Sequence, residues 1–329
     1  MQMDPSGWVT VIERDYLADF VREGGAAVKF VVSANETGRG QIRDRLREAA
    51  DRDSFQFAFV DASVTKIHLI DRLFHDVARQ IDWDVLIDAL LRRLLSESGI
   101  SVPEAERGLA LADLAALNGS PEIVFRTQVN RLIANALFRD YAMSQEFRFA
   151  MIFLCQSRLE PEADPALGDA IKAWLRGELR LVSGVKRALI FQKIARHNAR
   201  HMLFSLAHWL KVAGRSGLVL VLDIARYADS RRPAEREGGL YYSTAAALDA
   251  YEVLRQLIDA TDELEYGFVC VLTGPEFLSD DRRGVRSYHA LNLRIADEVR
   301  DRYRPNPLSA LTHLSTDSLA VDAGIECSR

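Results

Sequence analysis

Four short runs of apolar residues, each about as long as one β-strand, constrain the fold of this chain most. They span residues 28–32, 55–61, 217–223 and 266–274. Because nearly every position in them is apolar, each run is expected to be a strand covered on both faces, as in a parallel sheet. Helical patterns separate the runs, and strand–helix–strand units favour parallel pairing through right-handed crossovers. We therefore predict an α/β fold, with a short last strand between Leu308 and Leu314.

The spacing of the runs also predicts how the chain is divided. Residues 63–214 are far too long for one crossover, so we expect them to form a helical insertion. The predicted parts are 1–62 for the first half of the α/β core, 63–214 for the insertion, 215–314 for the second half of the core, and 315–329 for a disordered tail. Helices are expected at about 8–23, 38–52, 66–81, 84–97, 166–178, 185–213, 244–261 and 285–303, and a mobile loop at 226–243. Residues 121–157 are expected to form either one long helix or two stacked helices.

Composition excludes several classes of protein. With 48% hydrophobic residues in 329, the chain can bury a large core, which argues against global disorder. A formal net charge of −5 gives no general attraction to nucleic acid or to anionic membranes. The cysteines are far apart and have no metal-binding spacing, which fits a reducing compartment. Because no apolar run has the length of a membrane span, we expect a cytoplasmic protein without membrane contact.

The turn after the first apolar run lies where a P-loop NTPase carries its phosphate-binding loop. That loop has the pattern G-x-x-x-x-G-K-[ST], and its backbone N–H groups cradle phosphate at a helix N-terminus. When the pattern is laid over residues 33–40, only Gly38 agrees. Ser33 replaces the first glycine, Arg39 replaces the lysine, and Gly40 replaces the residue whose hydroxyl binds Mg²⁺. The sequence thus predicts the shape of a nucleotide site without much of its chemistry.

Each replacement changes how the turn would meet a nucleotide. Arg39 keeps a positive charge, but its planar guanidinium is bulkier than an ammonium group. Gln41 is an amide and brings no hydroxyl to Mg²⁺, while Glu36 adds a negative charge that would repel phosphate. Any nucleotide contacts here are expected from Gly38, Arg39, Gly40 and Gln41. The alternative, an ordinary strand–turn–helix corner, stays open.

The third apolar run ends in an acid, as does the strand that places a carboxylate near Mg²⁺ in P-loop ATPases. That acid is Asp223, and Ile224 occupies the next position, where a glutamate usually polarises the attacking water. Thr273 ends the fourth run, where a sensor residue would contact the γ-phosphate. We therefore expect Asp223 and Thr273 to belong to any nucleotide site, and we assign no catalytic residue.

Two further groups of side chains are candidates for contact or ligand sites. The arginines after the fourth run are candidates for contacts with a neighbouring subunit or with DNA, although a solvated loop is the simpler interpretation; they are Arg282, Arg283, Arg286 and Arg294. The arginines between 226 and 236 are candidates for DNA contacts as well. His197, His201 and His208 share one helical face, but arginines lie alongside and no carboxylate accompanies them, so no metal site is predicted.

With these pieces in order, the chain resembles the ATP-binding proteins of BREX-type bacterial phage-defence systems, which belong to the AAA+/STAND-like P-loop ATPases. The stretches that carry the resemblance are residues 173–178, 198–200, 217–223, 251–259 and 283–295. The similarity runs in matching order from about residue 10 to residue 314. It implies a RecA/AAA+-like parallel sheet with helical additions, ATP binding, and work beside other defence proteins on DNA.

The functional residues of that family carry over poorly, because the phosphate loop departs at three positions and the glutamate after Asp223 is absent. Each loss typically costs several kcal/mol of transition-state stabilisation. We therefore expect a pseudo-ATPase that acts as a scaffold or partner-binding subunit beside other defence proteins, with an intact ATPase as one candidate partner. Two alternatives stay open, an atypical ATPase that binds ATP and Mg²⁺ and a DNA-binding module. Homo-oligomers and DNA reached through partners also stay open.

Overall fold

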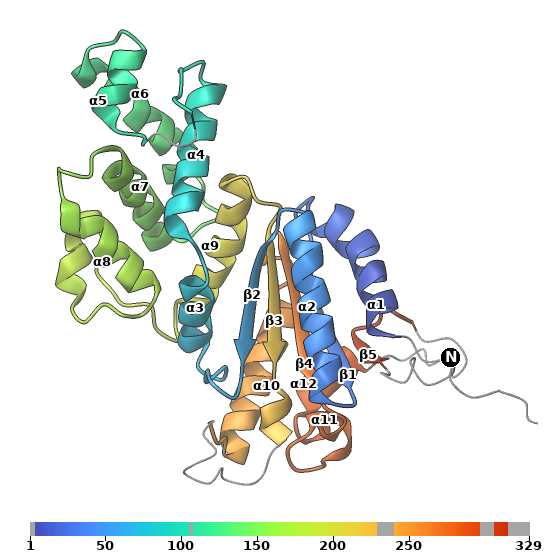
Figure 1. The fold of residues 1–329 in the computed structure, drawn as a ribbon. Helices are drawn as coiled ribbons and strands as arrows, with labels where there is room; N and C mark the ends of the chain where they lie inside the picture. Colours follow the sequence, from blue (N-terminus) through green and yellow to red (C-terminus); the bar gives the residue numbers. More distant parts are fainter. Residues whose placement is uncertain (1–3, 105–107, 229–239, 297–305, 315–329) are drawn as a thin grey trace, which may run out of the picture. The chain divides into compact units, whose positions relative to one another are not determined.

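The computed structural model describes residues 4–104, 108–228, 240–296 and 306–314. The chain divides into two compact units, one formed by residues 1–69 with 216–329 and the other by residues 70–215. The first unit holds the sheet, and the second is helical (Figure 1). The middle of the loop expected at 226–243, the end of the helix expected at 285–303 and the tail from 315 lie outside the described residues.

The first unit is built on a five-stranded sheet with strand order β2-β3-β4-β1-β5. Every pair of neighbouring strands is parallel, which confirms the predicted α/β fold. The strands are β1 (Ala26–Ser33), β2 (Gln56–Asp61), β3 (Leu218–Asp223), β4 (Gly267–Thr273) and β5 (Leu311–Leu314). Because the strands are parallel, the turn after β1 and the acid that ends β3 reach the same edge of the sheet. β4 lies between these two strands.

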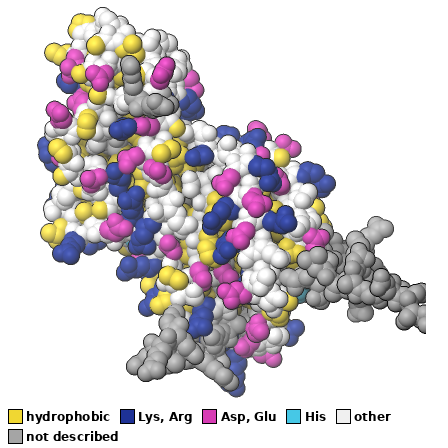
Figure 2. Space-filling model, viewed as in Figure 1, with side chains coloured by type: hydrophobic (Ala, Val, Ile, Leu, Met, Phe, Trp, Pro, Cys, Tyr) yellow, Lys and Arg dark blue, Asp and Glu magenta, His cyan; other side chains and the backbone are white. Residues whose placement is uncertain are grey.

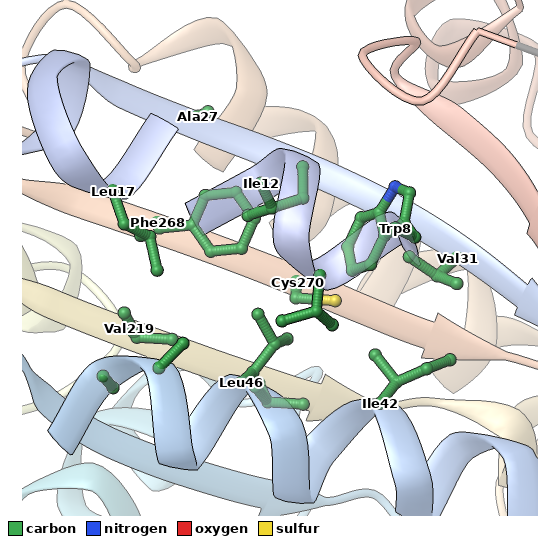
Figure 3. Packing of buried hydrophobic residues seen from close by; sticks show 14 of the residues in the cluster. Trp8, Ile12, Leu17, Ala27, Val31, Ile42, Leu46, Val219, Phe268 and Cys270 are labelled. Carbon is green, nitrogen blue, oxygen red and sulfur yellow. The ribbon is translucent and has the colours of Figure 1, made fainter. Parts of the chain in front are cut away.

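One face of the sheet is covered by the N-terminal helices and by the helix after β1. These are α1 (Pro5–Ile12), the π-helical η1 (Glu13–Val21) and α2 (Glu36–Arg52). Figure 3 shows Trp8, Ile42 and Leu46 packed over strand residues such as Val219 and Cys270, all of them buried. The apolar spacing along α2 produces this contact, because Ile42, Leu46 and Ala49 recur at helical intervals. The core therefore holds α2 firmly against the sheet.

The other face is covered by α10 (Thr244–Asp259), α11 (Glu276–Ser279) and α12 (His289–Ile295). Phe30 of β1 stacks on Phe277 of α11 at 5.8 Å between ring centroids, and Tyr251 of α10 meets Phe277 edge-on. Two short 3-10 turns complete this unit, η4 (Ala225–Ala228) and η5 (Val285–Ser287). The predicted helix from 285 therefore begins as a 3-10 turn, and α12 starts only after Tyr288, which is not helical.

The helical unit contains a series of α-helices around a tryptophan-rich core. Its α-helices are α3 (Ile70–Arg79), α4 (Trp83–Glu97), α5 (Leu111–Leu117), α6 (Glu122–Ile133), α7 (Gln145–Leu159), α8 (Pro165–Leu175) and α9 (Ala199–Val212), joined by η2 (Ala134–Phe138) and η3 (Val182–Ala188). Trp83 and Trp209 stack at 5.6 Å. Among the helices that are described, none combines the length and the apolar character needed to cross a bilayer.

The helix predicted over 185–213 is wrong in its first half. The chain forms η3 and then an irregular segment, and α9 begins only at Ala199. Leu189 takes a left-handed conformation with φ of 58°, which ends η3. The indole N–H of Trp174 donates to the carbonyl of Gln192 across 2.9 Å, so this carbonyl is bonded outside any helix. Tertiary contacts thus override the helical pattern of the sequence.

Candidate functional site

The turn between β1 and α2 is shorter than a phosphate-binding loop. Only Ala34 and Asn35 lie between the end of β1 and the first residue of α2. Asn35 is the N-cap, and its side-chain oxygen accepts the N–H of Gly38 across 2.8 Å. The N–H of Arg39 is bonded to the carbonyl of Asn35, as in a regular first turn. Both backbone donors are therefore used within the helix.

Arg39, at the position of the P-loop lysine, forms an ion pair with Asp223. Its Nε donates to Oδ2 of Asp223 across 2.9 Å, and the two side chains are only 15% and 16% exposed. The other oxygen of Asp223 accepts the N–H of Ala225 across 3.0 Å. Both carboxylate oxygens thus have a donor from the protein. The arginine that would meet phosphate and the acid that would hold Mg²⁺ satisfy each other.

A second acid, Asp61, lies beside Asp223 at the edge of the sheet. It ends β2, which pairs in register with β3 so that Asp61 is opposite Asp223. The two acids line a pocket of about 330 Å³, together with Glu36, Thr37, Arg39, Gly40, Arg43, Phe59 and Leu272. Sequence reasoning missed Asp61 and Arg43. The signal for Asp61 was present, because the second apolar run also ends in an acid.

The pocket combines three carboxylates with two guanidinium groups. Arg43 lies over the ring of Phe59 at 5.1 Å and bonds Asp44 across 2.8 Å. Its pKa is raised, chiefly by the hydrogen bond with Asp44 and to a smaller extent by the charges of Asp223 and Asp61. The arginine stays charged at any physiological pH. The acids of the pocket are therefore partly neutralised by arginines from α2 rather than left for a cation.

The other predicted nucleotide contacts are not brought together in this pocket. Gly38 is buried with its N–H capped, Gln41 is exposed on α2, and Thr273 is buried at the end of β4. Ile224 is also buried, and its N–H bonds the carbonyl of Leu272 across 2.9 Å. Of the six predicted residues, Arg39, Gly40 and Asp223 line the pocket.

These residues do not fit ATP with Mg²⁺ as a P-loop would. Phosphate needs free N–H groups at the turn, yet Gly38 and Arg39 donate to Asn35. Mg²⁺ prefers carboxylate and hydroxyl oxygens, but Asp223 is paired and Gly40 has no side chain. Glu36 faces the same pocket and adds negative charge.

The comparison with protein families decides which group the chain is part of. A family model described as BREX system ATP-binding protein BrxC/D matches residues 9–321, nearly the whole chain. The chain belongs to this family. The resemblance drawn from the sequence is thereby confirmed, and membership supports a defence-related, ATPase-like role beside other components of the BREX system. No curated protein and no solved structure gave a significant match.

Arg283 and Gly284, in one of the stretches that resemble the BrxC/D family, hold several segments of the chain together. The guanidinium of Arg283 donates to the carbonyls of Tyr242 and Tyr227 across 3.0 and 3.2 Å, and the side chain is 6% exposed. A Cβ on Gly284 would lie 2.6 Å from the carbonyl oxygen of Phe277, so only glycine fits. Arg283, predicted as a contact with DNA or a neighbouring subunit, is thus buried in this structure, and its guanidinium bonds within the chain.

The rest of this stretch meets another stretch of the family resemblance, residues 251–259, in a charged network between α10 and α12. Glu252 accepts from Arg255 across 2.6 Å and from the hydroxyl of Tyr288 across 2.5 Å. Arg294 donates to Asp259 across 2.9 Å, and Arg255 also bonds Asp259. The hydrogen bond with Arg255, followed by those with Tyr288 and Gln256, lowers the pKa of Glu252 to about 2. Arg294, predicted as a contact residue, takes part in this network.

The remaining predicted residues lie on the surface or away from the pocket. Arg282 and Arg286 are exposed, and Arg286 lies 3.7 Å from Asp281. His208 bonds Asp140 across 2.8 Å, a carboxylate from a distant part of the sequence that reasoning along one helix could not find. Within the described ranges, no group of three His, Cys, Asp or Glu residues is placed to hold a metal.

Proposed function

We propose that this chain is a non-hydrolysing member of the BrxC/D family, a pseudo-ATPase that serves a BREX complex as a scaffold or partner-binding subunit. The ion pair between Arg39 and Asp223 is the observation that supports this most. An ATPase needs both groups free, one for phosphate and the other for Mg²⁺. Here each neutralises the other, and Ile224 stands where the water-polarising carboxylate would be. The proposed partners are other defence proteins, an intact ATPase among them, in the cytoplasm.

The ion pair also sets the size of the barrier to nucleotide binding. A hydrogen bond between charged groups contributes about 1.5–3 kcal/mol to stability. A nucleotide that broke the pair would lose that amount, which weakens binding by roughly 10- to 150-fold. The repulsion between phosphate and Glu36 acts in the same direction. Both effects lower the affinity of the pocket for ATP.

Thermal unfolding with and without ATP–Mg²⁺ tests the proposal. Ligand at a hundred times its Kd stabilises a protein by about 2.7 kcal/mol, which would raise Tm measurably. We expect no shift for the wild-type chain at 5 mM ATP and 10 mM MgCl₂. Arg39→Ala is the test variant, and Arg45→Ala is the control, because Arg45 lies on the exposed side of the same helix. A shift in the wild type that Arg39→Ala removes and Arg45→Ala keeps would overturn the proposal.

An ATP-binding subunit that hydrolyses ATP slowly is the second candidate. The pocket beside Arg39 and Arg43, at about 330 Å³, is within the size range of small-molecule sites, and the family is described as ATP-binding. A turnover assay separates the two, performed on pure protein with BREX partners present. Turnover that Arg39→Ala abolishes would favour this candidate, whereas no turnover favours the pseudo-ATPase.

A further inference from the structure

Although the net charge of the chain is −5, one long segment contains no acidic residue. Between residues 179 and 222 there is no Asp or Glu. The same segment holds eight basic residues: Arg180, Lys186, Arg187, Lys193, Arg196, Arg200, Lys211 and Arg215. An excess of one sign over such a length is expected to create a local positive field, even on an acidic protein.

In the first part of this segment, residues 179–198, several apolar side chains are buried and the basic side chains are exposed. Val185, Ala188, Ile190 and Ile194 are buried in the helical unit. Two hydrogen bonds fix the backbone of this segment: the indole N–H of Trp174 donates to the carbonyl of Gln192, and the ammonium group of Lys193 donates to the carbonyl of Arg180. Basic side chains consequently face outward on a folded surface. We call this surface, formed by Arg180, Lys186, Lys193 and Arg196, the basic face.

The basic face has little compensating negative charge. In the part of the chain that the structure describes, none of these four cations has a carboxylate within salt-bridge distance. The acids nearby are used by other groups, because Asp164 pairs with Arg187 and Glu146 accepts from the Gln192 side chain. Figure 2 shows Lys and Arg side chains over the lower part of the helical unit, with Asp and Glu side chains among them.

Apolar side chains are exposed among these cations. Phe191 is 67% exposed and Leu181 is 71% exposed. Leu189 is 46% exposed in a left-handed conformation, which costs a non-glycine residue roughly 1–2 kcal/mol. A positively charged surface with a protruding aromatic ring is the arrangement that binds single-stranded nucleic acids, in which phosphates meet cations and bases stack on rings. If the ligand were an acidic protein, its carboxylates would pair with the cations, but the exposed ring would have no role in binding.

We propose that the basic face, together with Phe191, binds single-stranded nucleic acid through its phosphate backbone and one stacked base. The face lies on the helical unit and does not involve the pocket beside Arg39. It also differs from the arginines after β4 that the sequence first suggested. The proposal is independent of nucleotide binding at the pocket, so either can fail without the other.

Fluorescence anisotropy with the full chain and a labelled 20-nucleotide single strand tests this face. Binding should weaken as salt rises from 50 to 300 mM, with a slope of about −0.7 in log K against log salt for each phosphate contacted. The test variant is Lys186→Gln/Lys193→Gln/Arg196→Gln, which should reduce the slope by about 2. The matched control is Arg45→Gln/Lys66→Gln/Arg131→Gln, which removes three exposed cations elsewhere and leaves the same net charge.

Phe191→Ala distinguishes a stacked strand from general charge attraction. Loss of one stacked base is expected to weaken single-strand binding by about fivefold or more and to leave duplex binding unchanged. Equal loss in the test and control triple variants, or no binding at 50 mM salt, would overturn the proposal. It also fails if duplex DNA or polyglutamate competes as well as an unlabelled single strand, because the face would then prefer a duplex or an acidic protein. Circular dichroism confirms that each variant is folded.

Discussion

Breaking the ion pair between Arg39 and Asp223 should destabilise the sheet unit by a measurable amount. Arg39→Met keeps most of the side-chain volume and removes the charge, and Asp223→Asn removes the charge alone. Fully buried pairs lose about 3–5 kcal/mol when one partner is removed, and exposed pairs contribute less than about 1 kcal/mol. At 15% and 16% exposure, this pair lies nearer the buried limit. Asp223 also keeps the N–H of Ala225 as a donor. We expect a loss of about 2 kcal/mol for each variant.

A double-mutant cycle isolates the interaction from other effects of each substitution. The combined variant should lose less than the sum of the single variants, with a coupling of about 1–2 kcal/mol. Because the chain has two compact units, a single unfolding curve is hard to assign. Hydrogen exchange followed by mass spectrometry across a urea series reports β1, α2 and β3 separately, with α4 and α7 as an internal reference. A coupling below about 0.3 kcal/mol in folded variants would show that Arg39 is not held by Asp223, which would return it to a phosphate role.

Three further predictions follow from other parts of the sheet unit. Gly40→Ala should stabilise the chain by about 0.5–1 kcal/mol in urea unfolding, since a Cβ there meets no atom within 4 Å and Gly disfavours helix; destabilisation would mean that α2 begins later than Asn35 indicates. Arg283→Met should cost about 3 kcal/mol by leaving buried carbonyls unpaired, while the exposed Arg282→Gln should change stability by less than about 0.5 kcal/mol. Because the pKa of Glu252 falls from 4.5 to about 2 on folding, its stabilisation is complete above about pH 4.5 and is lost as pH falls towards 2. The Tm difference between wild type and Glu252→Gln should therefore shrink over that range; a difference that stays constant with pH would refute it.

Much of the sheet was predictable, because fully buried parallel strands give short, continuous apolar runs with sharp ends. Asp223 was identified for the same reason, since it stands where such a run stops. The neighbour of Asp223 was not identified, because its place depends on the order of strands in the sheet. β2 and β3 are adjacent although a whole helical unit separates them in the sequence. Only that adjacency places Asp61 beside Asp223 in the pocket.

Side chains with distant partners were the least predictable. Arg283 follows a run of charged residues, which on sequence alone indicates a solvated loop. Its burial results from carbonyls of Tyr227 and Tyr242, which belong to segments that no local pattern connects to it. The start of α2 was misplaced by two residues for a more local reason. The Asn35 cap was overlooked because the stretch was compared with a glycine-rich loop.

The burial of Arg283 has a consequence for genetics. A selection for cells that have lost phage resistance would recover substitutions at this arginine as readily as substitutions in a genuine interaction surface, because cells carrying them would contain little folded protein. Its neighbour Arg282, one position away and exposed, would be recovered only if it contacts something. The cellular abundance of the two mutant proteins should therefore be compared before any binding experiment is done. Low abundance indicates a substitution that prevents folding, and normal abundance indicates one that removes a contact.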